Sequence, residues 1–400
     1  MPYAFAERVG RMQSSAIREI LKITESPGVI SFAGGLPAPE MFPLDALRKA
    51  VNDALDEGGA TALQYSTTEG YLPLREKIAG TMREKGVDAE PENVFLTNGS
   101  QQALDLLAKL FIDPGDAVIV ENPSYLGAIQ VFRSYQARFV AVPTDEGGIV
   151  TEALEKAIRE QRPKFIYLTP TFKNPTGITM PRERREAVAA LLEKYRIPLI
   201  EDDPYSELRY AGEAVPPLKS FDRTARTIYL STFSKTIAPG LRLGWVVAEK
   251  DLVSKLILAK QGTDLHTSTL VQRAVYRYLT AADASGHIKT IRREYGRRRE
   301  TMIRAMREQF PPGVAWTEPE GGMFLWVTLP PGLDSGTLLE EAVAEKVAYV
   351  PGAPFFATGG GENCLRLNFS NTPPASIKDG IGRLARLLGR RMANQDGTRG

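Results

Sequence analysis

Seven short apolar runs, rich in β-branched residues, recur through the middle of the chain, and segments with a helical pattern separate them. The runs are Asn93–Asn98, Asp116–Asn122, Arg138–Pro143, Lys164–Pro170, Ile197–Asp202, Thr227–Ser231 and Leu243–Ala248. Continuous apolar runs of this length are typical of strands buried on both faces, and segments such as Gln101–Phe111 and Arg182–Lys194 have the spacing of covering helices. The alternation predicts an α/β fold with a mostly parallel, seven-stranded sheet sandwiched by helices.

The pattern changes in the last third of the chain. A long helical stretch at residues 271–310 comes first, followed by strands at 322–329, 348–350 and 365–370 and helices at 336–346 and 376–391. We therefore predict a large domain at residues 46–280, a smaller α/β domain at residues 281–400, and an N-terminal segment at residues 1–45 that packs with the small domain and the site. Both chain ends would then build the smaller domain.

Length and composition agree with two soluble domains. The chain has 400 residues, of which 43% are hydrophobic and 24% charged, values typical of globular proteins rather than of fibrous, disordered or membrane proteins. Fifty Lys and Arg residues against 48 Asp and Glu give a net charge of +2. No global basic field therefore requires a nucleic acid or an anionic membrane as partner.

Cysteine and histidine are scarce. The single cysteine, Cys364, cannot form an intramolecular disulfide, and with two histidines there is no Cys/His cluster for zinc, so we predict no metal site. From the charged residues near the N-terminus and the lack of a long apolar run, we expect neither a signal peptide nor a membrane span. We expect a cytoplasmic protein in a reducing compartment, with a borrowed organic cofactor for any chemistry beyond acid–base work.

Two strand ends carry turn-like motifs where ligands bind in open α/β sheets. The first strand runs into Gly99, Ser100 and Gln101 at the start of a helix, where free backbone N–H groups and the helix dipole favour an anion. An ordinary helix cap has the same pattern. The fourth strand is followed by Lys173–Gly177 (KNPTG), whose dipeptides are also those of a simple tight loop.

Two further strand ends carry charged side chains. Glu201, Asp202 and Asp203 end the fifth strand, and carboxylates are costly to bury there unless a cation pairs with them. Successive carboxylates are also typical of a magnesium ligand pair. The sixth strand leads directly to Lys235, whose amine would be held inside the crevice rather than in solvent.

Together these motifs resemble those of the fold-type-I, class I/II aminotransferases, which use pyridoxal 5'-phosphate. The set comprises Asn-Pro-x-Gly at 174–177, Asp-x-x-Tyr at 202–205, Ser-Lys at 234–235, an arginine at 242 and a late strand arginine at 366. The segments SFAGGLP (31–37), LQYS (63–66) and GSQQALD (99–105) are most similar to the 2-aminoadipate/kynurenine aminotransferase branch. The large domain would then be the cofactor-binding domain.

The resemblance implies catalytic roles. Lys235 would hold the cofactor as a Schiff base and then move the proton between the substrate Cα and the cofactor. Asp202 would pair with the pyridine nitrogen, since the family spacing that ends at Tyr205 selects it over Asp203. Tyr205 and Asn174 would hydrogen-bond the phenolic oxygen of the cofactor.

The resemblance also implies how the rest of the cofactor is held. Tyr125 would stack on the ring, although its spacing fits a core tyrosine nearly as well. The phosphate would be bound by Ser100, Gln101, Thr232, Ser234 and Arg242. The family more often has serine at position 232, and threonine keeps the hydroxyl. Tyr65 would reach the phosphate from a second subunit, which implies a homodimer with sites at its interface.

Substrate recognition follows from the same resemblance. Arg366 would grip the substrate α-carboxylate, assisted by Asn174; a surface salt bridge is the alternative for an isolated strand arginine. Arg18 would face a distal carboxylate of the substrate; the alternative is that it pairs with a nearby acid. Gly35 and Leu36 would line the same pocket. The implied activity is transfer of the α-amino group between 2-aminoadipate, an aromatic or a branched-chain amino acid and 2-oxoglutarate, by a ping-pong mechanism.

Other functions compete with this one. The arginine-rich run at residues 292–299 is diluted by acidic residues and fits a solvated helix face better than a nucleic-acid site. The fold also supports β-elimination and decarboxylation with the same cofactor. A third alternative is the effector-sensing module of a transcriptional regulator, but this needs an additional N-terminal recognition helix, whereas the aminotransferase pattern begins by Arg11.

Overall fold

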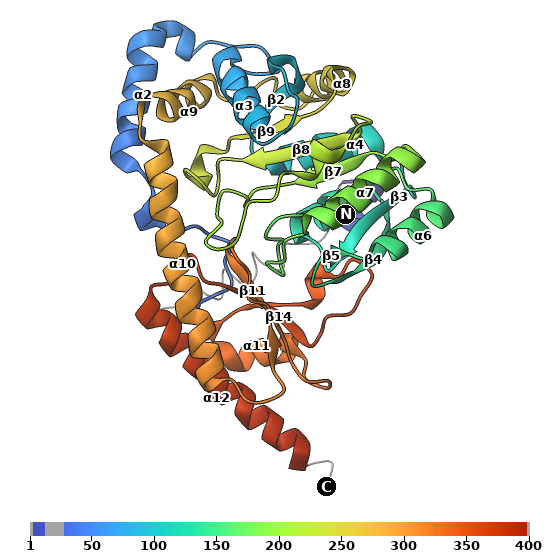
Figure 1. The fold of residues 1–400 in the computed structure, drawn as a ribbon, viewed down its shortest axis with the longest axis vertical. Coiled ribbons are helices and arrows are strands. Elements are labelled where there is room, and N and C mark those ends of the chain that lie inside the picture. Colours follow the sequence, from blue (N-terminus) through green and yellow to red (C-terminus); the bar gives the residue numbers. More distant parts are fainter. Residues whose placement is uncertain (1–2, 13–27, 398–400) are drawn as a thin grey trace.

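The computed structural model describes residues 3–12 and 28–397, and its larger part is built on one eight-stranded sheet (Figure 1). The strand order is β2-β9-β8-β7-β6-β3-β4-β5. The strands are β2 (Val94–Thr97), β3 (Ala117–Asn122), β4 (Arg138–Asp145), β5 (Gly148–Ile149), β6 (Phe165–Leu168), β7 (Leu199–Asp202), β8 (Thr227–Thr232) and β9 (Gly244–Val247). β3, β4, β6, β7 and β8 pair in parallel, and β9 runs antiparallel to both of its neighbours.

The α/β fold with helices on both faces is confirmed, but the predicted strand number was wrong by one. All seven predicted strands are present, and β5 is the eighth; it pairs antiparallel with the end of β4. Two residues are too few to produce a recognisable hydrophobic pattern.

Side chains that alternate along the strands form one hydrophobic core on each face of this sheet. In β3, Val118 and Val120 pack on one face, whereas Ile119 packs on the other, because successive side chains of a strand point to opposite sides. The first face is covered by α4 (Ser100–Phe111), α5 (Leu126–Ser134) and α8 (Lys250–Gln261). The second is covered by α6 (Thr151–Gln161) and α7 (Arg182–Tyr195).

A third apolar cluster lies beyond β2 and β9. It is formed with α2 (Leu44–Gly58), α3 (Leu72–Glu84) and α9 (Thr269–Ala281). Short 3-10 turns connect the elements: η1 (Glu7–Arg11), η2 (Pro39–Met41), η3 (Gly59–Ala62), η4 (Pro91–Asn93), η5 (Leu218–Phe221), η6 (Pro239–Leu241) and η7 (Ala353–Phe355).

The smaller part contains a four-stranded antiparallel sheet in the order β10-β11-β14-β13. Its elements are β10 (Ala315–Trp316), β11 (Phe324–Thr328), β13 (Val350–Pro351), β14 (Cys364–Asn368), α11 (Ser335–Ala344) and α12 (Pro374–Gly397). A separate parallel pair joins β1 (Ile30–Ser31) to β12 (Val347–Ala348). The N-terminal strand therefore lies with elements from the end of the chain.

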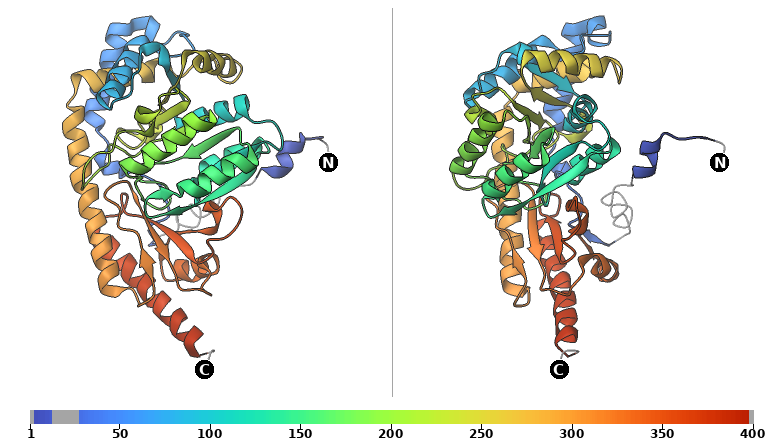
Figure 2. Two further views of the ribbon diagram at one scale, coloured as in Figure 1. Left: turned by 45° about the vertical axis from the view of Figure 1, so that its right-hand side comes forward. Right: turned by 90° about the vertical axis from the view of Figure 1, so that its right-hand side faces the viewer.

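The helical stretch predicted at residues 271–310 is two helices. α9 ends at Ala281, and α10 (Ala284–Gln309) begins after Asp283, whose side chain accepts a hydrogen bond from the backbone N–H of Gly286. An aspartate cap of this kind starts a new helix without a glycine or proline break. α10 then runs alongside both parts of the molecule (Figures 1 and 2).

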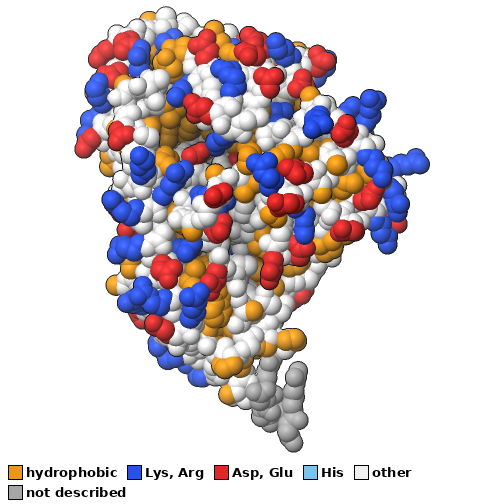
Figure 3. Space-filling view, in the orientation of Figure 1, with side chains coloured by type: hydrophobic (Ala, Val, Ile, Leu, Met, Phe, Trp, Pro, Cys, Tyr) orange, Lys and Arg blue, Asp and Glu red, His pale blue; other side chains and the backbone are white. Residues whose placement is uncertain are grey.

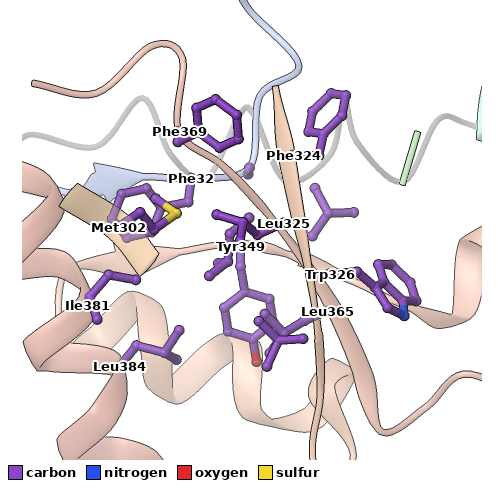
Figure 4. Close-up of a cluster of buried hydrophobic side chains, with 14 of the residues drawn as sticks. Phe32, Met302, Phe324, Leu325, Trp326, Tyr349, Leu365, Phe369, Ile381 and Leu384 are labelled. Carbon is purple, nitrogen blue, oxygen red and sulfur yellow. The ribbon is translucent and has the colours of Figure 1, made fainter. Parts of the chain in front are cut away.

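One core joins the two chain ends. Phe32 lies among Met302 of α10, Phe324 of β11, Tyr349 and Leu365, and all five side chains are buried (Figure 4). Burial of large apolar side chains contributes about 1.5–3 kcal/mol each, so this cluster fixes the loop after Phe32 against β11 and β14. The domain boundaries predicted at residues 45/46 and 280/281 stay predictions.

One face of the molecule carries both signs of charge without segregation. On the face shown in Figure 3, acidic and basic side chains are interspersed over the larger and smaller parts. Within residues 3–12 and 28–397, none of the helices is both long and apolar enough to cross a bilayer.

Candidate active site

The carboxyl ends of three neighbouring parallel strands bring the predicted site together. Asn174 lies in the loop after β6, Asp202 is the last residue of β7, and Lys235 follows β8. The loop after β1 and Arg366 of β14 come from the smaller part and contact the same region. The site is therefore built between the two sheets.

Asp202 presents one free carboxylate oxygen. Tyr167 Oη donates a hydrogen bond of 2.7 Å to Asp202 Oδ2, while buried Oδ1 has no partner within the described chain. Burial raises the pKa of Asp202 to about 7; the hydrogen bond from Tyr167 opposes this increase and the charge of Asp203 adds to it. A cationic N–H donor placed at Oδ1 would restore the charged form.

Asp203 is engaged in the fold itself. Its Oδ2 accepts a hydrogen bond of 2.8 Å from Tyr229 Oη, and its Oδ1 accepts one of 3.0 Å from the backbone N–H of Ser206. Glu201 accepts from two backbone N–H groups, those of Leu218 and Lys219.

No group of three His, Cys, Asp or Glu suited to a metal ion occurs in the part of the chain that the structure describes.

Lys235 holds an amine with a lowered pKa. Its Nζ donates to the carbonyl oxygen of Gly35 at 2.8 Å, and it forms no ion pair with any acid among the residues described. Burial, together with the charges of Arg366 and Arg242, lowers the pKa of Lys235 to about 8. An amine with this pKa is a nucleophile and a proton carrier near neutral pH.

Arg366 is buried without a carboxylate partner among the described residues. It is 1% exposed, and its guanidinium donates to Asn174 Oδ1 at 2.8 Å and to the carbonyl oxygen of Ala33 at 2.7 Å. Its Nε has no hydrogen-bond partner in the described structure, and its guanidinium carbon lies 4.2 Å from the ring centroid of Phe324. Burial lowers the pKa of Arg366 to about 10. The alternative of a surface salt bridge, considered from the sequence, is therefore wrong, because Arg366 is buried and forms no ion pair with a described carboxylate.

Two tyrosines line the same region. Tyr205 is 4% exposed, its ring packs edge-on against Phe324, and burial raises its pKa, an effect that a hydrogen bond with Asn174 opposes. Tyr125 immediately precedes α5, and its hydroxyl donates to Gln101 Oε1 at 3.4 Å. Burial and the nearby charge of Asp202 raise the pKa of Tyr125 to about 12. Both hydroxyls therefore stay protonated as donors.

The residues predicted to bind phosphate surround the amino end of α4. Ser100 and Gln101 open this helix, and Arg242 donates to Ser234 Oγ at 3.5 Å and to the carbonyl oxygen of Asn98 at 3.4 Å. Thr232 Oγ1 and Ser234 Oγ are 2.9 Å apart. Gly99 has φ +75°, a backbone conformation that favours glycine, and a Cβ there would lie 2.5 Å from Arg242 Nη2.

The remaining predicted residues lie at the edge of the site or outside it. Tyr65 is 78% exposed and contacts His266 edge-on. Leu36 is 45% exposed, and its carbonyl oxygen accepts a hydrogen bond from Ser370. Arg18 lies outside the described residues. Cys364 is buried near Thr328, as expected of a packing residue.

Sequence reasoning missed the residues that support these groups. Tyr167 was not singled out, although a hydroxyl inside an otherwise apolar strand needs a partner and is a usable signal. The carbonyl oxygens of Ala33 and Gly35 give no signal, since any residue supplies a carbonyl. Phe324 and Phe355, which flank the Arg366 guanidinium, are indistinguishable from core residues in the sequence.

Comparison with known proteins identifies the family. Residues 28–384 match the model of aminotransferase class I and II. The chain belongs to this family. Aromatic-amino-acid aminotransferase 1 of Thermococcus litoralis is 45% identical to this aminotransferase over 390 residues, which cover 96% of this chain and 94% of that protein.

Solved structures agree in fold over nearly the whole chain. The α-aminoadipate aminotransferase LysN from Thermus thermophilus, complexed with N-(5'-phosphopyridoxyl)-L-leucine, has a TM-score of 0.91 and 43% identity, with 97% of this chain and 98% of that chain covered. Kynurenine aminotransferase from Pyrococcus horikoshii, in complex with PMP, has a TM-score of 0.93 and 42% identity, with 97% of each chain covered.

The aminotransferase uses pyridoxal 5'-phosphate, and its residues fit this cofactor. Asp202 Oδ1 is a buried acceptor with no partner in the described chain, as a pyridine N–H requires. The amine of Lys235 has a lowered pKa, as attachment of an aldehyde requires. Gly99 and Arg242 make the close packing of backbone and guanidinium that a phosphate site uses.

Proposed function

We propose that this aminotransferase moves the α-amino group between an L-amino acid and 2-oxoglutarate in two half-reactions, by a ping-pong mechanism. The amino donors would be 2-aminoadipate, aromatic or branched-chain amino acids. The names of the relatives support aromatic and 2-aminoadipate donors, and the phosphopyridoxyl-L-leucine bound to LysN supports a branched-chain donor. The observation that carries the proposal is the buried Arg366, whose guanidinium has no carboxylate partner among the described residues and lies with Lys235 in one site.

Lys235 is the proposed attachment point and proton carrier. When bound, pyridoxal 5'-phosphate supplies the ring that takes up the electrons left on the substrate α carbon. Nζ of Lys235 would accept the proton from that carbon and donate it to the cofactor. Its lowered pKa supports this role, because the neutral amine is abundant near neutral pH.

The neighbouring polar groups would tune the cofactor. Asp202 Oδ1 would accept from the pyridine nitrogen, with Tyr167 fixing the orientation of the carboxylate from the other oxygen. Tyr205 and Asn174 would hydrogen-bond the phenolic oxygen. Tyr125 would cover one face of the ring, a position supported by its contact with Gln101 at the start of α4.

The phosphate would be held by donors from three segments. These are Ser100, Gln101, Thr232, Ser234 and Arg242. Tyr65 would complete the site from a second subunit. Its exposure of 78% supports a homodimer, since a largely exposed tyrosine side chain is available to a partner.

Substrates would be oriented by their carboxylates. Arg366 would bind the α-carboxylate together with Asn174, and the 2.8 Å hydrogen bond between these residues supports their acting as a unit. Gly35 and Leu36 would line the side-chain pocket. Arg18 would recognise the distal carboxylate of 2-aminoadipate and 2-oxoglutarate.

Replacement of the lysine tests the central role. Lys235→Ala should abolish the visible absorbance of the lysine-bound cofactor and reduce turnover by about 10⁴-fold or more. Lys49→Ala, which removes an exposed lysine of α2, should change neither. Retained turnover in Lys235→Ala would overturn the assignment.

A donor panel tests the reaction class. The wild-type enzyme should form glutamate from 2-oxoglutarate with 2-aminoadipate, phenylalanine, kynurenine or leucine, and initial rates at several concentrations of both substrates should give parallel double-reciprocal lines. Release of ammonia and pyruvate from cysteine-like substrates, without glutamate, would instead indicate a β-lyase. Release of carbon dioxide from the amino acid would indicate a decarboxylase.

A further inference from the structure

An ion pair between a buried lysine and a partly exposed aspartate lies outside the phosphate-binding residues and contacts the segment that carries them. Lys260, near the end of α8, is 0% exposed, and its Nζ donates to Asp264 Oδ1 at 2.8 Å and Oδ2 at 3.0 Å. Complete burial lowers the pKa of Lys260, an effect that Asp264 opposes. Because a lysine is rarely buried without a specific partner, this pair needs an explanation beyond solubility or a surface salt bridge.

The same pair is bonded to the first turn of α4. Lys260 Nζ also donates to Gln102 Oε1 at 2.6 Å, and Gln102 Nε2 donates to Asp264 Oδ2 at 2.5 Å. Gln102 Oε1 accepts in addition from the backbone N–H of Asn98 at 2.8 Å, and Asn98 Nδ2 donates to Asp264 Oδ2 at 2.5 Å. Asp264 thus bonds both residues that flank Gly99, Ser100 and Gln101, and Lys260 bonds Gln102 and Asp264.

The network reaches the arginine of the site. The carbonyl oxygen of Asn98 accepts a hydrogen bond from Arg242 Nη2 at 3.4 Å, so the residue that binds Asp264 through its side chain binds Arg242 through its backbone. Gly99 between them has no room for a side chain against Arg242. A shift of Asn98 would therefore move the glycine, the start of α4 and the guanidinium together.

We propose that Lys260 and Asp264 are positioning residues for the cofactor phosphate: they fix Asn98 and Gln102, and thereby the donors of Ser100, Gln101 and Arg242. The pair also balances charge. Asp264 anchors two amides next to an anion site, and Lys260 neutralises the aspartate, which would otherwise repel the phosphate. This inference rests on the proposed phosphate site.

Non-covalent binding to the cofactor-free enzyme separates this role from general packing. Calorimetric titration of the full-length protein with pyridoxamine 5'-phosphate and with pyridoxamine compares the same ring with and without phosphate. Lys260→Met should weaken binding of pyridoxamine 5'-phosphate about tenfold or more and change binding of pyridoxamine by less than about twofold.

A double variant tests the charge argument. Lys260→Met/Asp264→Asn removes both charges and keeps one acceptor oxygen at position 264, so it should recover part of the affinity lost in Lys260→Met. Lys49→Met, in the exposed i,i+4 pair of Lys49 with Asp53 on α2, is the matched control and should bind both ligands as wild type does. If Lys260→Met does not fold, Gln102→Leu, which removes the amide that both Lys260 and Asp264 bond without changing any charge, should still weaken only the phosphorylated ligand.

Two outcomes would overturn the inference. Equal weakening of both ligands would make Lys260 a general structural residue, and unchanged binding of both would make it dispensable. Arg242→Ala in the same titration tests the phosphate site itself. If Arg242→Ala also binds pyridoxamine 5'-phosphate as wild type does, the proposed phosphate site fails, whereas a loss in Arg242→Ala without a loss in Lys260→Met refutes only the positioning role.

Discussion

The hydroxyl of Tyr167 donates a 2.7 Å hydrogen bond to one oxygen of Asp202 and leaves the other oxygen buried and without a partner in the described structure. The adjacent Asp203 has the opposite arrangement, because Tyr229 and the backbone of Ser206 occupy its two oxygens. The two neighbouring carboxylates are thus distinguished by their partners, and only Asp202 has an oxygen available to a cofactor.

This difference predicts opposite phenotypes for two conservative substitutions. Asp202→Asn should lower kcat at least about 100-fold with little loss of thermal stability, since an amide does not stabilise a protonated ring nitrogen. Asp203→Asn should instead destabilise the fold by about 1–3 kcal/mol and change kcat only a few-fold. Steady-state kinetics and thermal unfolding of both variants provide the test; the reverse pattern would assign the cofactor to Asp203.

The pKa of Asp202 predicts a pH-dependent stability of the cofactor-free enzyme. Because the folded protein raises this pKa from 3.8 to about 7, folding favours the neutral acid. The stabilisation is complete below about pH 4 and is lost as the pH rises toward 7. Between pH 5 and 7, the melting temperature of the wild type should therefore fall relative to that of Asp202→Asn, and a constant difference would contradict this prediction.

Arg366 should determine the affinity for every substrate. Arg366→Lys loses the two-pronged hydrogen bonding to a carboxylate, worth about 1.5–3 kcal/mol, so KM for amino and oxo acids alike should rise roughly 10- to 150-fold. Arg185 is a matched control, since it is equally buried but its guanidinium is occupied by Thr171 and backbone carbonyl oxygens. Arg185→Lys should reduce stability and leave KM unchanged. A similar KM increase in both variants would assign Arg366 to the fold.

Mixed dimers should show whether Tyr65 acts across a subunit interface. Tyr65→Ala and Lys235→Ala subunits are each expected to be nearly inactive alone. When they are combined at random, half of the dimers contain both kinds, and each of these has one site with both native residues, so about a quarter of the wild-type activity should return. If mixing restores nothing although sedimentation shows dimers, Tyr65 does not serve the partner's site.

Substrate preference should depend on Arg18. Arg18→Ala should weaken turnover of 2-aminoadipate and glutamate far more than that of leucine, because only the first two have a distal carboxylate. The comparison of kcat/KM for the three donors is the measurement. An equal loss for all three would assign Arg18 to structure.

The sequence by itself determined the fold class and the positions of the candidate site motifs along the chain. Apolar runs such as Asp116–Asn122 predicted the strands of the large sheet because burial on both faces leaves a local, readable pattern. The two-residue β5 and the break between α9 and α10 escaped prediction, since one is too short for a pattern and the other depends on a single aspartate cap. Lys235, Asp202 and Arg366 were found through the resemblance of their motifs to those of a known family.

Only the tertiary structure decided what each of these residues has around it. Asp202 keeps a free oxygen because Tyr167, 35 positions earlier in the chain, bonds the other. Arg366 is buried against Asn174 and Ala33, which are 192 and 333 positions away in sequence. Lys260 meets Gln102 across 158 positions, and it has no motif of its own. Hydrophobic periodicity is a property of neighbouring residues, whereas burial, pKa and hydrogen-bond partners depend on contacts between distant segments, which exist only once the two sheets and the N-terminal segment have packed together.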